Sequence, residues 1–235
     1  MYLQPEKQSQ PAGAVIIAVT SGKGGVGKTN IATNLSLCMA AENQRVVLMD
    51  ADLGLGNLDV LMNLNCRYNL SHVVAGKRTL QEVTQVGPGG VEVICGGSGI
   101  ESLANLSPFG RQRLIEELDG LQERSDIILI DTGAGIHSAV IGFCMAADHT
   151  LVVTTPEPTA MTDAYAMIKV LASRHYTGQI SLLVNMAASP AEGKKIYRQI
   201  ADVAGRFLNV AVFEAGILCR DETLPQAVRK REPVV

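Results

Sequence analysis

The sequence predicts a single α/β domain in which helices cover both faces of a mostly parallel sheet. Short apolar segments alternate along the chain with segments whose apolar residues recur at helical spacing, as in parallel strands joined by helical crossovers. The first strand runs into a glycine-rich loop and then into a helix. The chain has 235 residues, of which 47% are hydrophobic and 18% charged. This length suits one continuous core, although two small domains would also fit it.

The first strand is expected over residues 14–19 and the helix that follows over residues 30–39. Between them, Ser21-Gly22-Lys23-Gly24-Gly25-Val26-Gly27-Lys28-Thr29 has the phosphate-loop spacing of a glycine, four residues and Gly-Lys-Thr. Glycines let backbone N–H groups point at phosphate oxygens, and the N-terminus of the helix adds further donors. The sequence therefore predicts a three-layer P-loop NTPase fold. The alternative is an ordinary glycine turn, which the flanking elements and the Lys-Thr pair disfavour.

Each polar position of this loop has an expected role. Lys28 is expected to bridge the β- and γ-phosphates of ATP, and the Thr29 hydroxyl to bind Mg2+. Lys23 is a second cation at a position that the generic motif leaves free, and a solvated surface charge is its alternative interpretation. The residues expected to bind ATP here are Lys23, Gly24, Gly25, Val26, Gly27, Lys28, Thr29 and Asn30.

A second buried strand is expected over residues 45–49, and it ends at Asp50 and Asp52. Ligands of open α/β sheets bind at the carboxyl ends of the strands, so both carboxylates should face the same crevice as the phosphate loop. Two carboxylates at this spacing can serve a magnesium ion, one holding metal-bound water and the other orienting the attacking water. An acidic turn at a strand end is the alternative.

The middle of the chain carries weaker signals. Short helices are expected over residues 69–76 and 80–83, and a strand over residues 91–95 after a glycine-rich turn at 87–90. Ser107-Pro108 has the order of a helix cap and a first-turn proline, which predicts a helix to about Gln122.

The apolar segment 126–131 ends in Asp131 and has the Walker B arrangement. Asp131 is therefore expected to hold Mg2+ through water or through Thr29. Gly133 and Gly135 would allow a second switch segment to approach the γ-phosphate. An apolar strand that ends in aspartate is common, so this assignment depends on the phosphate loop that precedes it.

The last part of the chain predicts strands over 150–154 and 180–184 and a helix over 159–173 whose apolar face belongs to the core. Asn185 follows the last of these strands. Its amide both donates and accepts hydrogen bonds, as the edge of adenine requires, and a turn asparagine is the alternative.

The stretch from Lys23 to Thr29 resembles the deviant phosphate loop of the MinD/ParA class of ATPases. In that class the early lysine reaches across a homodimer to the partner's phosphates, so the resemblance implies that ATP drives dimerisation through Lys23. It also implies that Asp52 positions or activates water, that Asp50 belongs to the outer shell of the metal, and that Asn185 reads the base. The implied catalytic residues are Asp52, Lys23 and Lys28, the implied metal residues are Thr29, Asp50 and Asp131, and Arg220 is placed with Asn185 near ATP.

The resemblance narrows to the flagellar branch of this class, called FleN or FlhG, which controls flagellar number and placement. Residues 86–91, 156–165, 184–187 and 189–193 carry the likeness, which covers residues 14–235 as one MinD-like ATPase domain. Residues 1–13 are polar, contain proline and are expected to form a flexible tail.

Three features depart from the family pattern. Relatives usually continue beyond residues 232–235 with a final helix and an amphipathic membrane-targeting segment, so we expect either a shortened chain or no membrane attachment. The N-terminal tail lacks the glutamine-containing helix by which some members stimulate a GTPase of flagellar assembly. Residues 218–221 stand where relatives usually have a proline, which weakens the assignment of Arg220 to adenine.

Composition limits the other function classes. A net charge of -3 provides no broad attraction to DNA or to anionic lipid, so DNA binding is not expected.

The five cysteines include no CxxC pair, which argues against a disulfide framework or a zinc site. This pattern favours a reducing cytosol, and most of the cysteines are expected to be small core residues. No signal or membrane-spanning segment is visible, so the expected location is cytoplasmic or peripheral at the inner face of the membrane.

Together these expectations describe a slow, partner-regulated ATP hydrolase with ATP and Mg2+ as ligands and a homodimeric ATP state. The resemblance implies a FleQ-like transcription regulator or an FlhF-like GTPase as partner. The alternatives are another MinD/ParA-type positioning ATPase, in cell division or DNA partition, and a regulator that senses ATP without hydrolysing it. An iron–sulfur reductase similar to nitrogenase iron protein would need paired cysteine ligands, and the surroundings of Cys95 and Cys144 do not match that pattern.

Overall fold

The computed structural model describes residues 13–52, 56–97, 117–118 and 120–235. Within these residues the strands form an eight-stranded sheet in the order β3-β4-β2-β5-β1-β6-β7-β8. All neighbouring strands are parallel except β3 and β4. The strands are β1 (Val15–Ser21), β2 (Val46–Ala51), β3 (Gln85–Val86), β4 (Glu92–Ile94), β5 (Ile127–Ala134), β6 (His149–Thr154), β7 (Gln179–Ala187) and β8 (Phe213–Cys219).

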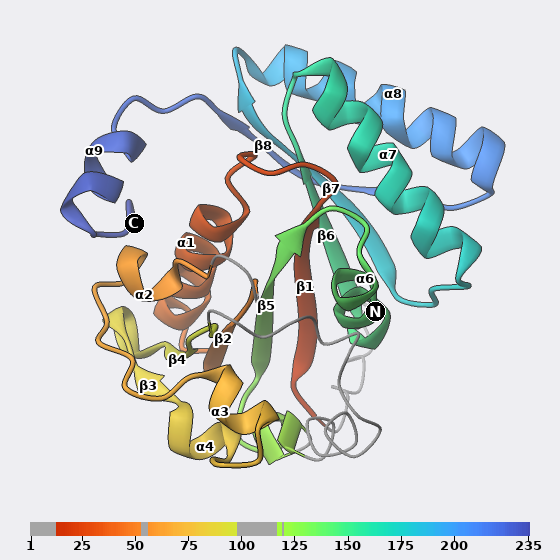
Figure 1. The fold of residues 1–235 in the computed structure, drawn as a ribbon. Helices are drawn as coiled ribbons and strands as arrows, with labels where there is room; N and C mark the ends of the chain where they lie inside the picture. Colours follow the sequence, from red (N-terminus) through yellow and green to blue (C-terminus); the bar gives the residue numbers. More distant parts are fainter. Residues whose placement is uncertain (1–12, 53–55, 98–116, 119) are drawn as a thin grey trace, which may run out of the picture.

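Helices cover both faces of this sheet (Figure 1). They are α1 (Lys28–Ala41), α2 (Leu58–Leu61), α3 (Leu70–Val74), α4 (Leu80–Val83), α6 (Ser138–Ala146), α7 (Pro158–Ser173), α8 (Pro190–Leu208) and α9 (Leu224–Lys230), with a short 3-10 helix η1 (Pro88–Gly90). The predicted α/β class and the three layers are confirmed.

The core is divided between the two faces because successive side chains of a strand point in opposite directions. Val47 and Met49 of β2 belong to the core cluster that also contains residues of α6, α7 and α8, whereas Leu48 between them belongs to the cluster on the side of α1. The long helices α7 and α8 lie side by side over one face (Figure 1).

Several elements lie outside the predictions. The elements that the sequence does not predict are α2, β3, α6, α8, β8 and α9. Of the helix expected from Ser107 to about Gln122, residues 107–116 lie outside the described residues, and the described part ends as a helix at Gln122. The tail expected over residues 1–13 also lies outside them, apart from Gly13. In the parts of the chain that are described, no helix is both long and apolar enough to span a bilayer.

The expectation for the cysteines is wrong in two respects, the absence of a disulfide and the burial of most of these residues. Cys66 and Cys95 form a disulfide between the segment before α3 and the end of β4. Of the three free cysteines, Cys144 is a buried core residue as expected, but Cys38 and Cys219 are exposed. The spacing of the two paired cysteines gives no hint of this contact, because the sheet brings them together.

Candidate functional site

The phosphate loop joins β1 to α1 with the geometry that its glycines predict. Gly25 and Gly27 have φ values of 78° and 92°, in the left-handed region that favours glycine. The first hydrogen bond of α1 runs from the N–H of Ile31 to the carbonyl of Gly27 at 3.0 Å. The helix therefore begins at Lys28, and its free N–H groups face the loop, as phosphate binding requires.

Two other contacts place this loop against the rest of the sheet. Gly22 lies so close to the backbone carbonyl of Asp163 in α7 that any Cβ at this position would overlap with it. A Cβ at Gly27 would lie 2.5 Å from the side-chain nitrogen of Asn185. Both glycines are thus required by close approach, and the first of them connects the loop directly to α7.

Lys28 is 8% exposed at the N-terminus of α1. Burial lowers the pKa of its ammonium group, and the negative charges of Asp131 and Asp52 act in the opposite direction. The three side chains therefore form one electrostatic cluster at the carboxyl ends of β2 and β5. This is the position from which Lys28 is predicted to contact phosphate.

Asp131 is 1% exposed, and burial raises the pKa of its carboxyl group to about 7. A hydrogen bond from Thr29 and the charge of Lys28 oppose this rise. Among the described residues, Asp131 Oδ1 has no hydrogen-bond partner although it is buried. An unpaired carboxylate oxygen beside the Thr29 hydroxyl supplies the hard oxygen donors that Mg2+ prefers, so these two residues fit a magnesium ion.

Asp50 stands next to Asp131 across the β2–β5 ladder, but its carboxylate is occupied by the backbone. Its Oδ1 accepts a hydrogen bond from the N–H of Asp52 at 3.0 Å, and its Oδ2 accepts one from Leu58 at 3.4 Å. Burial raises the pKa of Asp50 to about 6, against these two hydrogen bonds. In this structure the Asp50 carboxylate therefore binds the backbone at Asp52 and at Leu58.

Asp52 is half-buried beside the second glycine segment. Its Oδ1 lies 3.5 Å from the position that a Cβ of Gly133 would take, and its charge reaches Lys28. The structure thus brings Asp52, Lys28, Thr29 and Asp131 together. The roles of these residues in water activation and metal binding stay predictions.

Lys23 lies at the edge of this cluster and is bound to α7 of the same chain. Its ammonium nitrogen is 2.7 Å from Glu157 Oε1 and 2.9 Å from Thr159 Oγ1. The two charged side chains are 34% and 57% exposed. Glu157 and Thr159 were missed as site residues, because their stretch was used only as a family likeness. The predicted contact of Lys23 with a partner's phosphates stays a prediction.

Asn185 is 7% exposed at the end of β7 and contacts the phosphate loop. Its Nδ2 donates to the carbonyl of Val26 at 2.8 Å, and its Oδ1 accepts from the N–H of Met186 at 2.9 Å. Arg220 follows β8, and its N–H donates to the carbonyl of Ala187 at 2.9 Å while the residue itself is exposed. Both residues therefore lie at the carboxyl edge of the sheet, and their contact with adenine stays a prediction.

Comparison with known proteins identifies relatives of this chain. The family profile described as an AAA domain matches residues 14–182. The antiactivator FleN of Pseudomonas aeruginosa is 43% identical over 219 residues, which cover 93% of this chain and 78% of that protein. The flagellum site-determining protein YlxH of Helicobacter pylori is 38% identical, over 92% of this chain and 73% of its own length.

Solved structures of cell-division ATPases have the same fold. MinD of Pyrococcus horikoshii, solved with Mg-ADP, superimposes with a TM-score of 0.78 at 23% identity, over 94% of this chain and 87% of that one. The MinC:MinD complex of Aquifex aeolicus matches with a TM-score of 0.77 at 26% identity, over 94% and 88% of the two chains. From its phosphate loop, its carboxylate cluster and these relatives, the chain belongs to the MinD/ParA class of P-loop ATPases and, within it, to the flagellar branch that contains FleN and FlhG.

Proposed function

We propose that this protein is a slow, magnesium-dependent ATPase that dimerises on binding ATP and acts as a switch in the control of flagellar number and placement. The observation that supports it best is the unpaired, buried oxygen of Asp131 beside Thr29, at the start of a helix suited to bind phosphate. The similarity to the antiactivator FleN supports the flagellar role.

The chemistry proposed for this site is positioning and neutralisation of charge. The loop N–H groups and Lys28 hold the β- and γ-phosphates, and Asp52 orients the attacking water. Magnesium bound by Thr29 and Asp131 supplies positive charge to the phosphate oxygens. Because Asp52 lies against Gly133, a change in the second glycine segment would move the water-orienting carboxylate.

Lys23 is proposed to act between two copies of the chain. In the ATP state it leaves Glu157 and contacts the phosphates bound by the partner, where it takes the part of an arginine finger. Hydrolysis in one protomer then depends on the presence of the other. This dependence would make turnover slow until a partner protein stabilises the productive dimer.

The proposed partner is a flagellar regulator or assembly protein, either a FleQ-like transcription regulator or an FlhF-like GTPase. The proposed location is the cytoplasm, with peripheral association at the inner face of the membrane as a further possibility for the family. DNA is not a proposed partner because the net charge of -3 offers no general attraction to it.

The test is a mass measurement of the purified chain by sedimentation with ADP, ATP and a non-hydrolysable ATP analogue, together with phosphate release. We expect a monomer with ADP, a dimer with the analogue, and phosphate release that requires Mg2+. Lys28→Ala is the matched control, because it removes the phosphate contact and should therefore stay monomeric with the analogue and release no phosphate. A dimer with ATP but no phosphate release, alone or with either partner, would instead identify a regulator that only senses ATP.

The flagellar role needs a cellular test. A strain that carries the Lys28→Ala protein should show an altered number or placement of flagella, as should a strain without the protein. Normal flagella in both strains together with a defect in cell division or in DNA partition would assign the chain to one of the other positioning functions of this class.

A further inference from the structure

The disulfide between Cys66 and Cys95 joins two segments that the site uses. Cys66 lies between α2 and α3, and Cys95 follows β4 directly. Their Cα atoms are 6.5 Å apart, within the range that a disulfide spans. Cys95 is 3% exposed, whereas Cys66 is half-buried. Reagents in solution therefore reach Cys66 first.

The Cys95 side of the pair contacts the carboxylate at the end of β2. The residue after Cys95 is Gly96, and a Cβ at Gly96 would lie 2.9 Å from Cγ of Asp50. Asp50 in turn binds the N–H groups of Asp52 and Leu58. The end of β4 thus packs directly on the carboxylate that binds the backbone at Asp52 and at Leu58.

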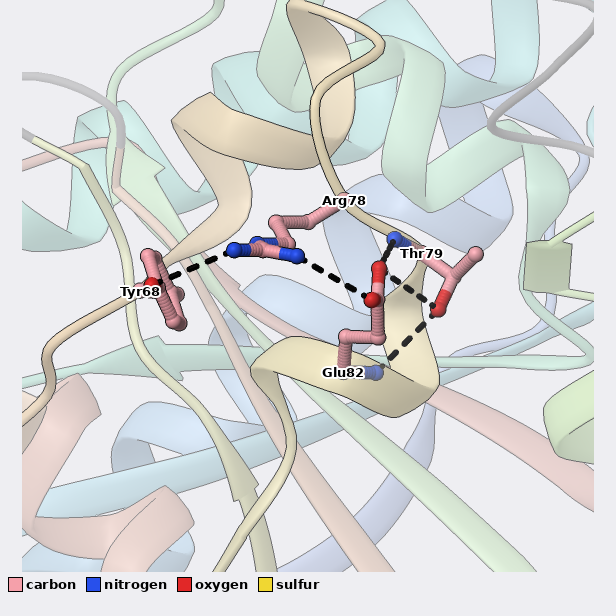
Figure 2. Close-up of polar contacts among 4 residues, drawn as sticks. All are labelled: Tyr68, Arg78, Thr79 and Glu82. Atoms are coloured by element: carbon pink, nitrogen blue, oxygen red, sulfur yellow. Dashed lines mark hydrogen bonds and ion pairs between the residues drawn. The ribbon is translucent and has the colours of Figure 1, made fainter.

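Cys66, the other member of the pair, lies in the loop that connects α2 to α3. Tyr68, two positions further on, is fixed by Arg78: the guanidinium lies 4.4 Å from the ring centroid and donates to the hydroxyl at 3.2 Å (Figure 2). Arg78 also pairs with Glu82 at 3.2 Å in the capping box of α4 (Figure 2). The N–H of Leu70 donates to the carbonyl of Cys95 at 2.9 Å. These contacts do not involve sulfur, so they keep the two cysteines near each other when the disulfide is reduced.

We propose that Cys66 and Cys95 are a reversible thiol–disulfide site that regulates ATP turnover by restricting the segment between Leu58 and Cys66. This inference rests on the proposed ATPase function for its effect on turnover, but the thiol chemistry itself does not. The oxidised form covalently links the end of this segment to β4. The N–H of Leu58, at the start of this segment, binds the same carboxylate as the N–H of Asp52, the residue proposed to orient the attacking water. A covalent link at the other end of the segment limits movement around Asp52, so the disulfide form turns over more slowly than the dithiol form.

The co-substrate is a low-molecular-weight disulfide of the glutathione type. The Cys66 thiolate attacks one sulfur of that disulfide, which forms a mixed disulfide and releases one thiol. The Cys95 thiolate then attacks the Cys66 sulfur, which forms the Cys66–Cys95 bond and releases the second thiol. The two cysteines lose two protons and two electrons in all, and the small disulfide gains them. A dithiol reverses both steps.

The experiment is a titration of the purified full chain with mixtures of reduced and oxidised glutathione. Thiol status is read by alkylation and peptide mass spectrometry, mobility by hydrogen exchange in peptides that cover residues 56–66, and turnover by phosphate release. We expect Cys66 and Cys95 to lose their alkylation together, exchange in these peptides to slow about tenfold, and turnover to fall about fivefold. Dithiothreitol should reverse all three changes.

Two variants and a control make the outcome decisive. Cys66→Ser and, separately, Cys95→Ala should turn over ATP at the rate of the reduced protein under all conditions. Cys38→Ser, at an exposed free cysteine, should behave as the wild type. If Cys66 and Cys95 stay alkylatable throughout the titration, or if they pair without a change in exchange or turnover, the proposal is overturned. If even the reduced protein releases no phosphate, the proposed ATPase function is rejected. The alkylation and hydrogen-exchange measurements then still test whether Cys66 and Cys95 pair reversibly and restrict the segment.

Discussion

Replacement of Glu157 by glutamine should strengthen the ATP-dependent dimerisation that we propose for this protein. Lys23 Nζ lies 2.7 Å from Glu157 Oε1 and 2.9 Å from Thr159 Oγ1. If Lys23 contacts the partner's phosphates in the dimer, both contacts must break in each protomer. Glutamine keeps the size of the side chain but removes its negative charge, so Lys23 is released more readily.

The size of the effect follows from the exposure of the pair. Since the Lys23 and Glu157 side chains are 34% and 57% exposed, water and salt screen their attraction. An exposed ion pair of this kind changes an equilibrium by about two- to fivefold. A dimer contains two copies, so the dimerisation constant should rise by about four- to twenty-five-fold if the copies act independently. The increase should shrink as salt is added.

Sedimentation velocity with a non-hydrolysable ATP analogue measures this constant. Lys23→Ala should bind the analogue but form no dimer, and Glu157→Gln should dimerise at lower protein concentration than the wild type. The control is Asp126→Asn, which breaks a 2.7 Å exposed ion pair with Arg45 at the opposite end of the strands and should change nothing. A normal dimer of Lys23→Ala, or a Glu157→Gln dimer no stronger than that of the wild type, refutes the proposed exchange of partners.

Three further predictions concern the site itself. Asp52→Ala should give a stable ATP dimer whose turnover is at least about a hundredfold lower, measured by sedimentation and phosphate release, and a monomer would contradict the assignment. The pKa of Asp131 is about 7 in the folded protein, against a usual value of 3.8, so the folded state binds this proton more tightly than the unfolded state does. Between about pH 4 and about pH 7 the unfolded state has lost the proton and the folded state has not. The free energy of unfolding of the nucleotide-free protein therefore falls as pH rises through this range. Asp131→Asn should therefore raise the melting temperature more at pH 8 than at pH 5 and abolish stabilisation by Mg2+, and equal shifts at both pH values would contradict this. Gly22→Ala should lower the free energy of unfolding by about 1–3 kcal/mol, because the new Cβ would overlap with the backbone of Asp163. Gly24→Ala is the control and should unfold near the wild-type temperature, because its Cβ would lie 4.0 Å from the nearest atom, the Cβ of Ala134.

The sequence alone was sufficient where local chemistry decides the structure. The phosphate loop and the strand before Asp131 were predicted because glycine torsions, helix N–H groups and a terminal carboxylate have strict local requirements. The helix α8 was missed although Ser189 and Pro190 provide a cap and a first-turn proline, so its signal was present. In contrast, α6 is apolar on every side and has no helical period to detect.

The remaining differences depend on contacts between distant residues. The strand β8 is largely exposed and contains Gly216, so it lacks the alternation of a half-buried strand. Lys23 and Glu157 are 134 residues apart, and Cys66 and Cys95 are 29 residues apart. Lys23 meets Glu157 because β1 lies beside β6 in the sheet, and Cys66 meets Cys95 because the segment before α3 packs against the end of β4. Asp50 is a related case. The sequence predicts its position at the end of a strand, but it does not predict that two backbone N–H groups donate hydrogen bonds to its carboxylate.

The order of strands in the sheet also has a consequence for biosynthesis. The strand β1 leaves the ribosome first, but its two neighbours are β5 and β6, which begin at Ile127 and His149. Until those residues emerge, the nascent chain carries an apolar strand with both edges unpaired, which is a state prone to aggregation. Because the phosphate loop follows this strand, the loop gains both neighbouring strands only after more than half of the polypeptide has been translated. Premature termination before β5 yields a product in which the strand before the phosphate loop has no partner.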